Sequence, residues 1–232
     1  YPTYQAACSL AGATVRTYEL SEERNWLPDL DALGKQDLSR VKIMWVNYPH
    51  MPTGAKADAE FFTQLRDFAR KHTILLVNDN PYSFILNEHP MSMLSIPGMK
   101  DVAIELNSLS KSHNMAGWRI GAAIGKAEIL QPVMKFKSNM DSGMFLPLQE
   151  AAAKALEADV SWFENQNLLY QSRQKLVFHL MDLLGCRYDP AQTGMFVWAK
   201  VPDEYPSGYA LSDKILAGNA VFITPGGIFG SQ

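Results

Sequence analysis

Polar side chains follow three apolar runs of the sequence, at the points where strands of a sheet would end. The runs are 41–46, 74–77 and 102–106, and Asn47 comes directly after the first. A carboxylate, two hydroxyls, an amine and a guanidinium follow the other two runs: Asp79, Ser108, Ser110, Lys111 and Arg119. Because parallel α/β sheets bind ligands beyond the carboxyl ends of their strands, we expect these groups to converge at one edge.

Each of these groups suits one part of a phosphorylated aldehyde that carries a ring nitrogen. A lysine can form a Schiff base with an aldehyde, and a buried aspartate can keep a ring nitrogen protonated. An arginine and serine hydroxyls can hold a phosphate dianion, since the planar guanidinium gives two parallel hydrogen bonds. Any one of these residues alone is typical of a solvated loop. The set together meets the demands of pyridoxal 5′-phosphate.

The apolar runs predict the sheet that must position these residues. The runs are nearly continuous, which is typical of parallel strands that helices cover on both faces. Between the first two runs, residues 57–72 place Phe61, Leu65 and Phe68 on one face of a helix. A glycine-flanked run at 120–124 is a candidate fourth strand.

The second part of the chain has a different pattern. Residues 148–158 and 162–184 carry helical periodicity, and Gly185 is placed to end the second helix in a left-handed cap. Residues 195–201 and 220–224 are typical of strands. We therefore predict three parts, which are a large α/β domain, a connecting helical region and part of a smaller α+β domain. Their residue ranges are 1–150, 151–185 and 186–232.

Composition limits the class of protein and its partners. The 232 residues are 47% hydrophobic and 19% charged, as in soluble globular proteins. Formal charges of +21 and −24 leave −3, so we expect no nucleic-acid partner. No apolar run approaches the roughly 20 residues of a membrane-spanning helix.

The cysteines and histidines bear on compartment and metal content. Cys8 and Cys186 are far apart and form no metal-spaced pair, which favours a reducing, cytoplasmic setting. A single disulfide between them is the open alternative. The five histidines show no ligand spacing, so no metal site is expected.

Three segments resemble the motifs of one family, the fold-type I, class I/II aminotransferases. Residues 108–121 (SLSKSHNMAGWRIG) are similar to its cofactor-lysine signature, with the arginine at the expected offset. Residues 79–82 (DNPY) resemble its D-x-x-Y element, and residues 47–54 (NYPHMPTG) resemble its N-x-P-x-N-P-T-G loop. The three motifs stand in the family's order. The resemblance covers essentially the whole chain and implies a mostly parallel sheet, part of a small α+β domain and, at full length, a homodimer.

The resemblance also implies roles for individual residues. Lys111 would be the Schiff-base lysine and then the base that moves the substrate proton. Asp79 would pair with the pyridine nitrogen, and Tyr82 would donate a hydrogen bond to the ring 3′-oxygen. Ser108 and Arg119 would bind the phosphate, with Ser110 as a helper. The implied substrates are an amino acid and a 2-oxo acid, and residues 137–149 look similar to the aspartate, alanine or LL-diaminopimelate branch.

The sequence departs from the family pattern at one position of the 47–54 loop. Met51 stands where the family usually has the asparagine that precedes Pro-Thr-Gly. A thioether cannot donate the hydrogen bond of that asparagine. Two hypotheses follow: Tyr82 tunes the cofactor alone, or Asn47 replaces the missing amide.

The family is considerably longer at both ends. The amino-terminal phosphate loop and the carboxyl-terminal arginine that binds the substrate carboxylate are absent from the 232 residues. We therefore expect a fragment that binds the cofactor weakly and transaminates little by itself.

Other classes of function compete with this one. Residues 108–111 also form S-x-x-K, the nucleophile motif of acyl-serine enzymes, but residues 192–194 (QTG) lack the lysine of its K-T-G partner. Gly117, Gly121 and Gly125 do not have the spacing of a dinucleotide loop and suit close backbone packing instead. A C–S lyase of the same fold and a pyridoxal-phosphate-sensing regulatory domain stay open as alternatives.

Overall fold

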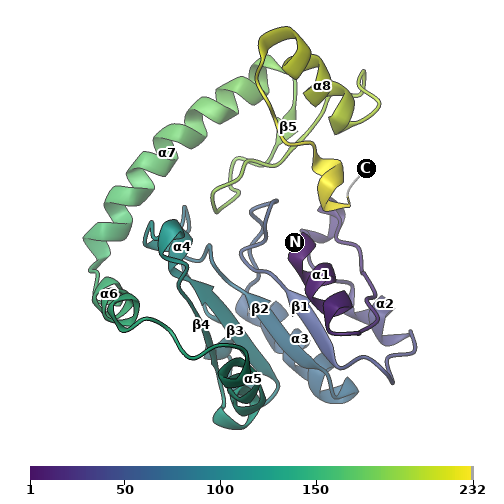
Figure 1. The fold of residues 1–232 in the computed structure, drawn as a ribbon. Coiled ribbons are helices and arrows are strands. Elements are labelled where there is room, and N and C mark those ends of the chain that lie inside the picture. The colour runs from purple at the N-terminus through teal and green to yellow at the C-terminus, as the bar shows by residue number, and fades with distance from the viewer. Residues whose placement is uncertain (231–232) are drawn as a thin grey trace.

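The computed structural model describes residues 1–230 and contains a four-stranded sheet (Figure 1). Its strands are β1 (Ile43–Val46), β2 (Leu75–Asp79), β3 (Ala103–Ser108) and β4 (Gly121–Gly125). They lie in the order β1-β2-β3-β4, with the first three parallel and β4 antiparallel to β3. The mostly parallel sheet predicted from the sequence is therefore confirmed.

Helix α3 (Ala59–His72) covers one face of the sheet. Asp58 caps it by accepting a hydrogen bond from the Phe61 amide at 2.8 Å, so the helix begins two residues later than predicted. Its apolar face packs with alternate residues of β1 and β2, which include Met44 and Leu76. This cluster is the main hydrophobic core.

Helix α1 (Pro2–Leu10) lies against the opposite face. The ring of Tyr4 stacks on Trp45, with 4.7 Å between centroids and 18° between planes. Trp45 alternates along β1 with the buried Met44 and Val46, so its side chain faces away from α3. Helices thus cover both faces, as predicted.

Strand β2 extends further than its apolar run. The predicted end was Val77, but the ladder to β3 continues through the pairs Asn78–Glu105 and Asp79–Leu106. It continues because the amide of Asn78 has a buried carboxylate beside it in Glu105, so neither polar side chain must leave the sheet for water.

Two helices connect the sheet with the rest of the chain. Helix α6 (Leu146–Leu156) precedes the long α7 (Val160–Leu183), as predicted to within two residues at each end. Gly185 has φ 69°, which confirms the left-handed cap. Near its start α7 docks on the sheet domain, since Phe163 stacks on Phe84 at 4.8 Å.

The carboxyl-terminal part corrects two predicted strands. Only β6 (Ala199–Lys200), paired with β5 (Arg187–Tyr188), forms within the predicted strand 195–201. The predicted strand 220–224 is wrong. Val221 and Phe222 are exposed, and no described segment forms a ladder with them, so their β-propensity has no partner strand to act on.

Several elements had no counterpart in the sequence analysis. The remaining helices are α2 (Leu30–Gly34), α4 (Leu109–Ser112), α5 (Ala127–Met140) and α8 (Gly208–Asn219). The 3₁₀ turns are η1 (Glu22–Arg24), η2 (Met93–Ser95), η3 (Met99–Asp101), η4 (Ala116–Trp118) and η5 (Gly226–Phe229). Within residues 1–230, none of the helices combines the length and the apolar character needed to cross a bilayer.

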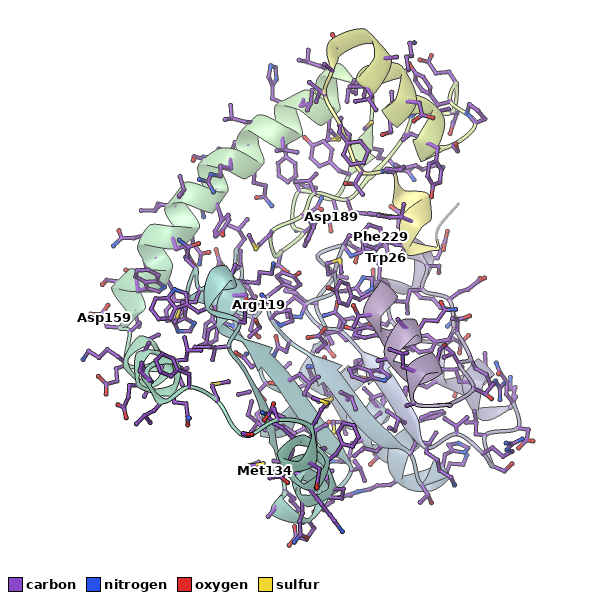
Figure 2. The ribbon with its side chains drawn as sticks, in the orientation of Figure 1. Trp26, Arg119, Met134, Asp159, Asp189 and Phe229 are labelled. Atoms are coloured by element: carbon purple, nitrogen blue, oxygen red, sulfur yellow. The ribbon has the colours of Figure 1, made fainter. Side chains whose placement is uncertain are left out.

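The carboxyl-terminal part folds back toward the amino-terminal part. Trp198 contacts Trp26 and Phe229 edge-on, each with 6.2 Å between ring centroids. Trp26 and Phe229 are labelled in Figure 2. Thr193 donates two hydrogen bonds to the Gly54 carbonyl, from its amide at 3.0 Å and from its hydroxyl at 2.9 Å. The small part thus touches the 47–54 loop directly.

Candidate active site

The carboxyl ends of β2 and β3 lie side by side and bring two of the predicted segments together. The Asn80 amide donates to the Leu106 carbonyl at 2.8 Å, and the Asn107 side-chain amide donates to the Asn80 carbonyl at 3.0 Å. Asp79 therefore stands beside the strand that ends at Ser108. This adjacency brings Asp79 and Ser108 to the same edge of the sheet, as expected for these two residues.

Asp79 has a hydrogen-bond donor that the sequence analysis missed. The hydroxyl of Tyr4 donates to Asp79 Oδ2 at 2.6 Å. Burial, and after it the charge of Asp79, raises the pKa of Tyr4 far above its ordinary range, so its hydroxyl keeps the proton it donates. No local signal marks Tyr4, because its role depends on how α1 docks on Trp45.

The 47–54 loop makes a hydrogen bond to the main chain of Asp79. Asn47 Nδ2 donates to the Asp79 carbonyl at 2.5 Å, while Asn47 Oδ1 accepts from the Met51 amide at 2.9 Å. Both polar atoms of this side chain thus contact the main chain, and Nδ2 has one further hydrogen that can donate.

Tyr82 is buried beside the same carboxylate. Burial, and then the negative charge of the neighbouring Asp79, raise the pKa of Tyr82 to about 12. The phenol is therefore protonated at neutral pH and can donate a hydrogen bond. Its ring meets Phe196 edge-on at 5.8 Å, which places a side chain of the small part next to the site.

Ser108 is the last residue of β3, and Lys111 lies on the helix α4 that follows it. Ser108 caps α4, with its Oγ accepting from the Ser110 amide at 3.2 Å. Through this contact Ser110 contributes its main chain rather than its hydroxyl. Lys111 is half-buried, and its Nζ makes no hydrogen bond or ion pair with the residues that the structure describes.

Arg119 lies beside α4, directly before β4 (Figure 2). The Leu109 amide donates to the Ile120 carbonyl at 3.2 Å, which keeps the two segments together. Glycine is required at 121, since a Cβ there would lie 2.8 Å from the Asn107 carbonyl oxygen. Arg119 itself has φ 55° and donates from one terminal nitrogen to the Ala116 carbonyl at 2.8 Å.

The site therefore gathers the predicted residues without joining them to one another. Among the described residues, no side chain of the predicted set makes a hydrogen bond to another side chain of that set: Asp79, Tyr82, Ser108, Ser110, Lys111 and Arg119. An amine without a partner, a guanidinium with no paired carboxylate in residues 1–230, a phenol and a carboxylate surround the edge. This donor set fits a phosphorylated pyridine aldehyde.

Comparison with solved structures places the fold. The apo structure of BacF from Bacillus subtilis has a TM-score of 0.93 and 36% identity, and covers 100% of this chain and 59% of its own. An aromatic aminotransferase from Pyrococcus horikoshii OT3 has a TM-score of 0.90 and 27% identity, with 100% and 63% covered. The fold is that of the fold-type I aminotransferases, as the sequence indicated.

The family model of class I and II aminotransferases matches residues 1–232, and the chain belongs to that family. The cofactor of this family is pyridoxal phosphate. A relative named LL-diaminopimelate aminotransferase, from Dehalococcoides mccartyi, is 38% identical over 234 residues, with 100% of this chain and 60% of the relative covered. One of the same name from Aquifex aeolicus is 38% identical over 232 residues, with 99% and 60% covered. The chain thus spans 60% of the length of these relatives.

Proposed function

We propose that this chain is the larger part of an enzyme that transfers an amino group between an amino acid and a 2-oxo acid. The observation that supports this most directly is the meeting of the β2 and β3 ends, with Asp79 at the end of β2, Ser108 at the end of β3 and Lys111 on the following helix. Membership of the aminotransferase family supports the same reaction.

Three groups of side chains would each bind a different part of the cofactor. Asp79 would hold a proton on the ring nitrogen, and Tyr82 would donate to the ring oxygen. Lys111 Nζ would hold the aldehyde carbon and then move a proton at the substrate Cα. Three residues would bind the phosphate: Ser108, Ser110 and Arg119. Pyridoxal phosphate, when bound, supplies a ring that accepts electrons from the substrate.

The geometry of Asp79 favours its proposed role. Tyr4 occupies one carboxylate oxygen, Oδ2, which leaves Oδ1 as an acceptor for a protonated ring nitrogen. A carboxylate beside a pyridinium stabilises the charged form of that ring. A strongly electron-accepting ring requires that charge.

The names of the relatives suggest the amino-group donor. LL-Diaminopimelate is in the name of several of them, so it is the first substrate that we propose. Elimination at a sulfur amino acid and ligand sensing are the alternatives, and both would use the same cofactor residues.

We further propose the organisation of the intact protein. The domain division at 1–150, 151–185 and 186–232 is supported by the confinement of the large sheet to residues 43–125 and of β5 and β6 to 187–200. A homodimer located in the cytoplasm is expected for the full-length chain. We also expect neither nucleic acid nor membrane as a partner.

The test uses the full-length protein with added pyridoxal phosphate. Borohydride reduction followed by peptide mass spectrometry should find the pyridoxyl group on Lys111. The Lys111→Ala variant should lose the label, whereas Lys154→Ala, at an exposed position of α6, should keep it. A label elsewhere would contradict the assignment.

Amino-acid donors then distinguish the reactions. Glutamate formed from LL-diaminopimelate and 2-oxoglutarate would support transamination, with a fall in amino transfer of about 10²–10⁴-fold in Lys111→Ala. Pyruvate and ammonia released from a sulfur amino acid would support the lyase. Binding of the cofactor without turnover of any donor would favour the sensing domain.

A further inference from the structure

Glu105 is a carboxylate in the interior of the sheet. It stands on β3, between β2 and β4, and is 5% exposed. No lysine, arginine or histidine within the described residues forms an ion pair with it. Its neighbours on the strand, Ala103 and Ile104, are apolar core residues.

Three donors satisfy this carboxylate. Glu105 Oε2 accepts from Asn78 Nδ2 at 3.1 Å and from the Met93 amide at 2.8 Å. Glu105 Oε1 accepts from Asn80 Nδ2 at 3.2 Å. Hydrogen bonds to an ionised acceptor are the stronger kind, and they offset part of the cost of burying the charge.

Two of the three donors flank Asp79. Side chains alternate across a strand, so Asn78 and Asn80 point to the face of Glu105, while Asp79 points to the face of Tyr4. Glu105 therefore accepts hydrogen bonds from the residue before Asp79 and from the residue after it, on the face of the sheet opposite to the Asp79 side chain. The main chain of Asp79 is fixed between them.

The same contacts extend to the loop that holds Asp79 from the other side. Asn78 Oδ1 accepts from the Tyr48 amide at 3.1 Å, and Asn47 Nδ2 donates to the Asp79 carbonyl. Asn78 thus joins Glu105 to the 47–54 loop. The position of Asp79 is determined by a connected set of hydrogen bonds whose buried end is Glu105.

Three buried donors require an acceptor at this position. A leucine would avoid the desolvation cost of a carboxylate, but it would leave two side-chain amides and one main-chain amide without an acceptor. The carboxylate does what leucine cannot, because it accepts from two side chains and a main-chain amide at once.

We propose that Glu105 is the positioning residue for Asp79, and that it fixes the direction in which the Asp79 carboxylate meets the cofactor ring nitrogen. This inference rests on the proposed function for the identity of that ring. A shift of the reacting groups by about 1 Å costs enzymes of the order of 10²-fold in rate. The hydrogen bonds that Asn78 and Asn80 donate to Glu105 hold residues 78–80 in place and so prevent such a shift.

The test compares Glu105→Leu with a core control in the full-length protein. Met99→Ala, in η3, removes a fully buried side chain that makes none of these contacts, so it reports on lost stability alone. The first measurement is the ¹⁵N chemical shift of the ring nitrogen of labelled pyridoxal phosphate. The second is the dissociation constant of the cofactor.

We expect Glu105→Leu to move the ring-nitrogen signal toward the unprotonated value and to weaken cofactor binding about tenfold. Met99→Ala should change neither quantity, although it destabilises the fold. Glu105→Gln keeps the shape and loses one acceptor oxygen, so it should give an intermediate shift. If Glu105→Leu does not fold, the Gln variant carries the test. A folded variant at Glu105 with the wild-type signal and affinity would overturn the proposal.

Two further arms separate positioning from structure and from the proposed function. The double variant Glu105→Gln/Asn80→Asp exchanges donor and acceptor across the contact and should restore part of the ring-nitrogen signal. In cofactor-free protein, the ¹³Cζ signal of Tyr4 should move in Glu105→Leu, because a redirected Asp79 loses that hydroxyl. An unmoved Tyr4 signal would overturn positioning. Absence of a Lys111 label in the wild type, with Tyr4 moved, would overturn only the proposed function.

Discussion

Asp79 and Lys111 stand on neighbouring segments of the sheet edge, yet the chain holds them to different degrees. Asp79 is bonded at Oδ2 by Tyr4, at its carbonyl by Asn47, and at both neighbours by Glu105. Lys111 lies on a four-residue helix and makes no polar contact through Nζ within residues 1–230. The ring-nitrogen side of the site is thus preorganised by several protein contacts, whereas on the other side Lys111 Nζ has no polar contact and Arg119 has no paired carboxylate among the described residues.

The difference follows from the surroundings of the strands. β2 lies between two strands, and Val77 and Asn78 are buried in it. Lys111 follows β3, which also lies between two strands, but it stands on α4, beyond the strand end. Asp79 belongs to β2 and is paired with Leu106 of β3, whereas no strand of the described residues is paired with Lys111.

Removing the charge of Asp79 should have the largest effect on this comparison. In Asp79→Asn the shape stays and the charge next to the ring nitrogen is lost, so we expect amino transfer to fall by about 10²–10³-fold. Steady-state kinetics measures this fall. Asp67→Asn, on the surface of α3, is the matched control and should leave amino transfer unchanged.

Lowering the pH should test how firmly the 47–54 loop is packed. Burial lowers the pKa of His50 from 6.5 to about 4, so the folded protein stays unprotonated there while the unfolded chain takes up a proton. Stability is then lost as the pH falls from about 6.5 to about 4, by up to about 3 kcal/mol. Urea unfolding at several pH values should show this loss, and His50→Asn should reduce it. An equal loss in His50→Asn and in a variant of the exposed His89 would contradict it.

Tyr4→Phe should sharpen the comparison by removing one contact from the firmly held side. The ring can still stack on Trp45, but the donor to Asp79 is lost, and we expect a destabilisation of about 1.5 kcal/mol. Thermal unfolding measures this. Tyr1→Phe is the control, because Tyr1 is 61% exposed, and a loss of the same size there would refute the assignment.

Hydrogen exchange should show the smallest and most direct difference. Binding of pyridoxal phosphate to the full-length protein should slow amide exchange in residues 108–121 more than in residues 76–82. The reason is that the first segment gains partners for Lys111 and Arg119, whereas the second is already bonded. Equal protection of both segments would break the comparison.

Local patterns were sufficient to predict part of the site. Asp79, Ser108 and Lys111 directly follow or end strands, so their place at the edge depends only on the strands being parallel neighbours. Tyr4 and Glu105 were not found, since their roles depend on the docking of α1 and on the register of β2 against β3. Neither the docking of α1 nor this register can be predicted from a short segment of the sequence.

The fold shows the same division between local and distant causes. The helix at 59–72 follows from local spacing and was predicted to within two residues, although its cap at Asp58 was not predicted. The predicted strand at 220–224 failed because a strand exists only with a neighbour, and the sequence pattern does not say whether one is near. Helix α8 was missed for lack of a clear apolar stripe between Gly208 and Asn219.

Helix α7 and the chain beyond it are both hydrogen-bonded to the segment that follows Tyr82. Near its start, Asn167 accepts from the Leu86 amide at 2.9 Å and donates to the Phe84 carbonyl at 3.0 Å. Beyond its far end, about 36 Å away for 24 residues, the chain returns, and the Gly194 amide donates to the Ile85 carbonyl at 2.9 Å. Residues 84–86, next to Tyr82, are therefore hydrogen-bonded both from α7 and from the chain beyond it. A movement of the small part relative to the sheet would act first on the segment that carries Tyr82.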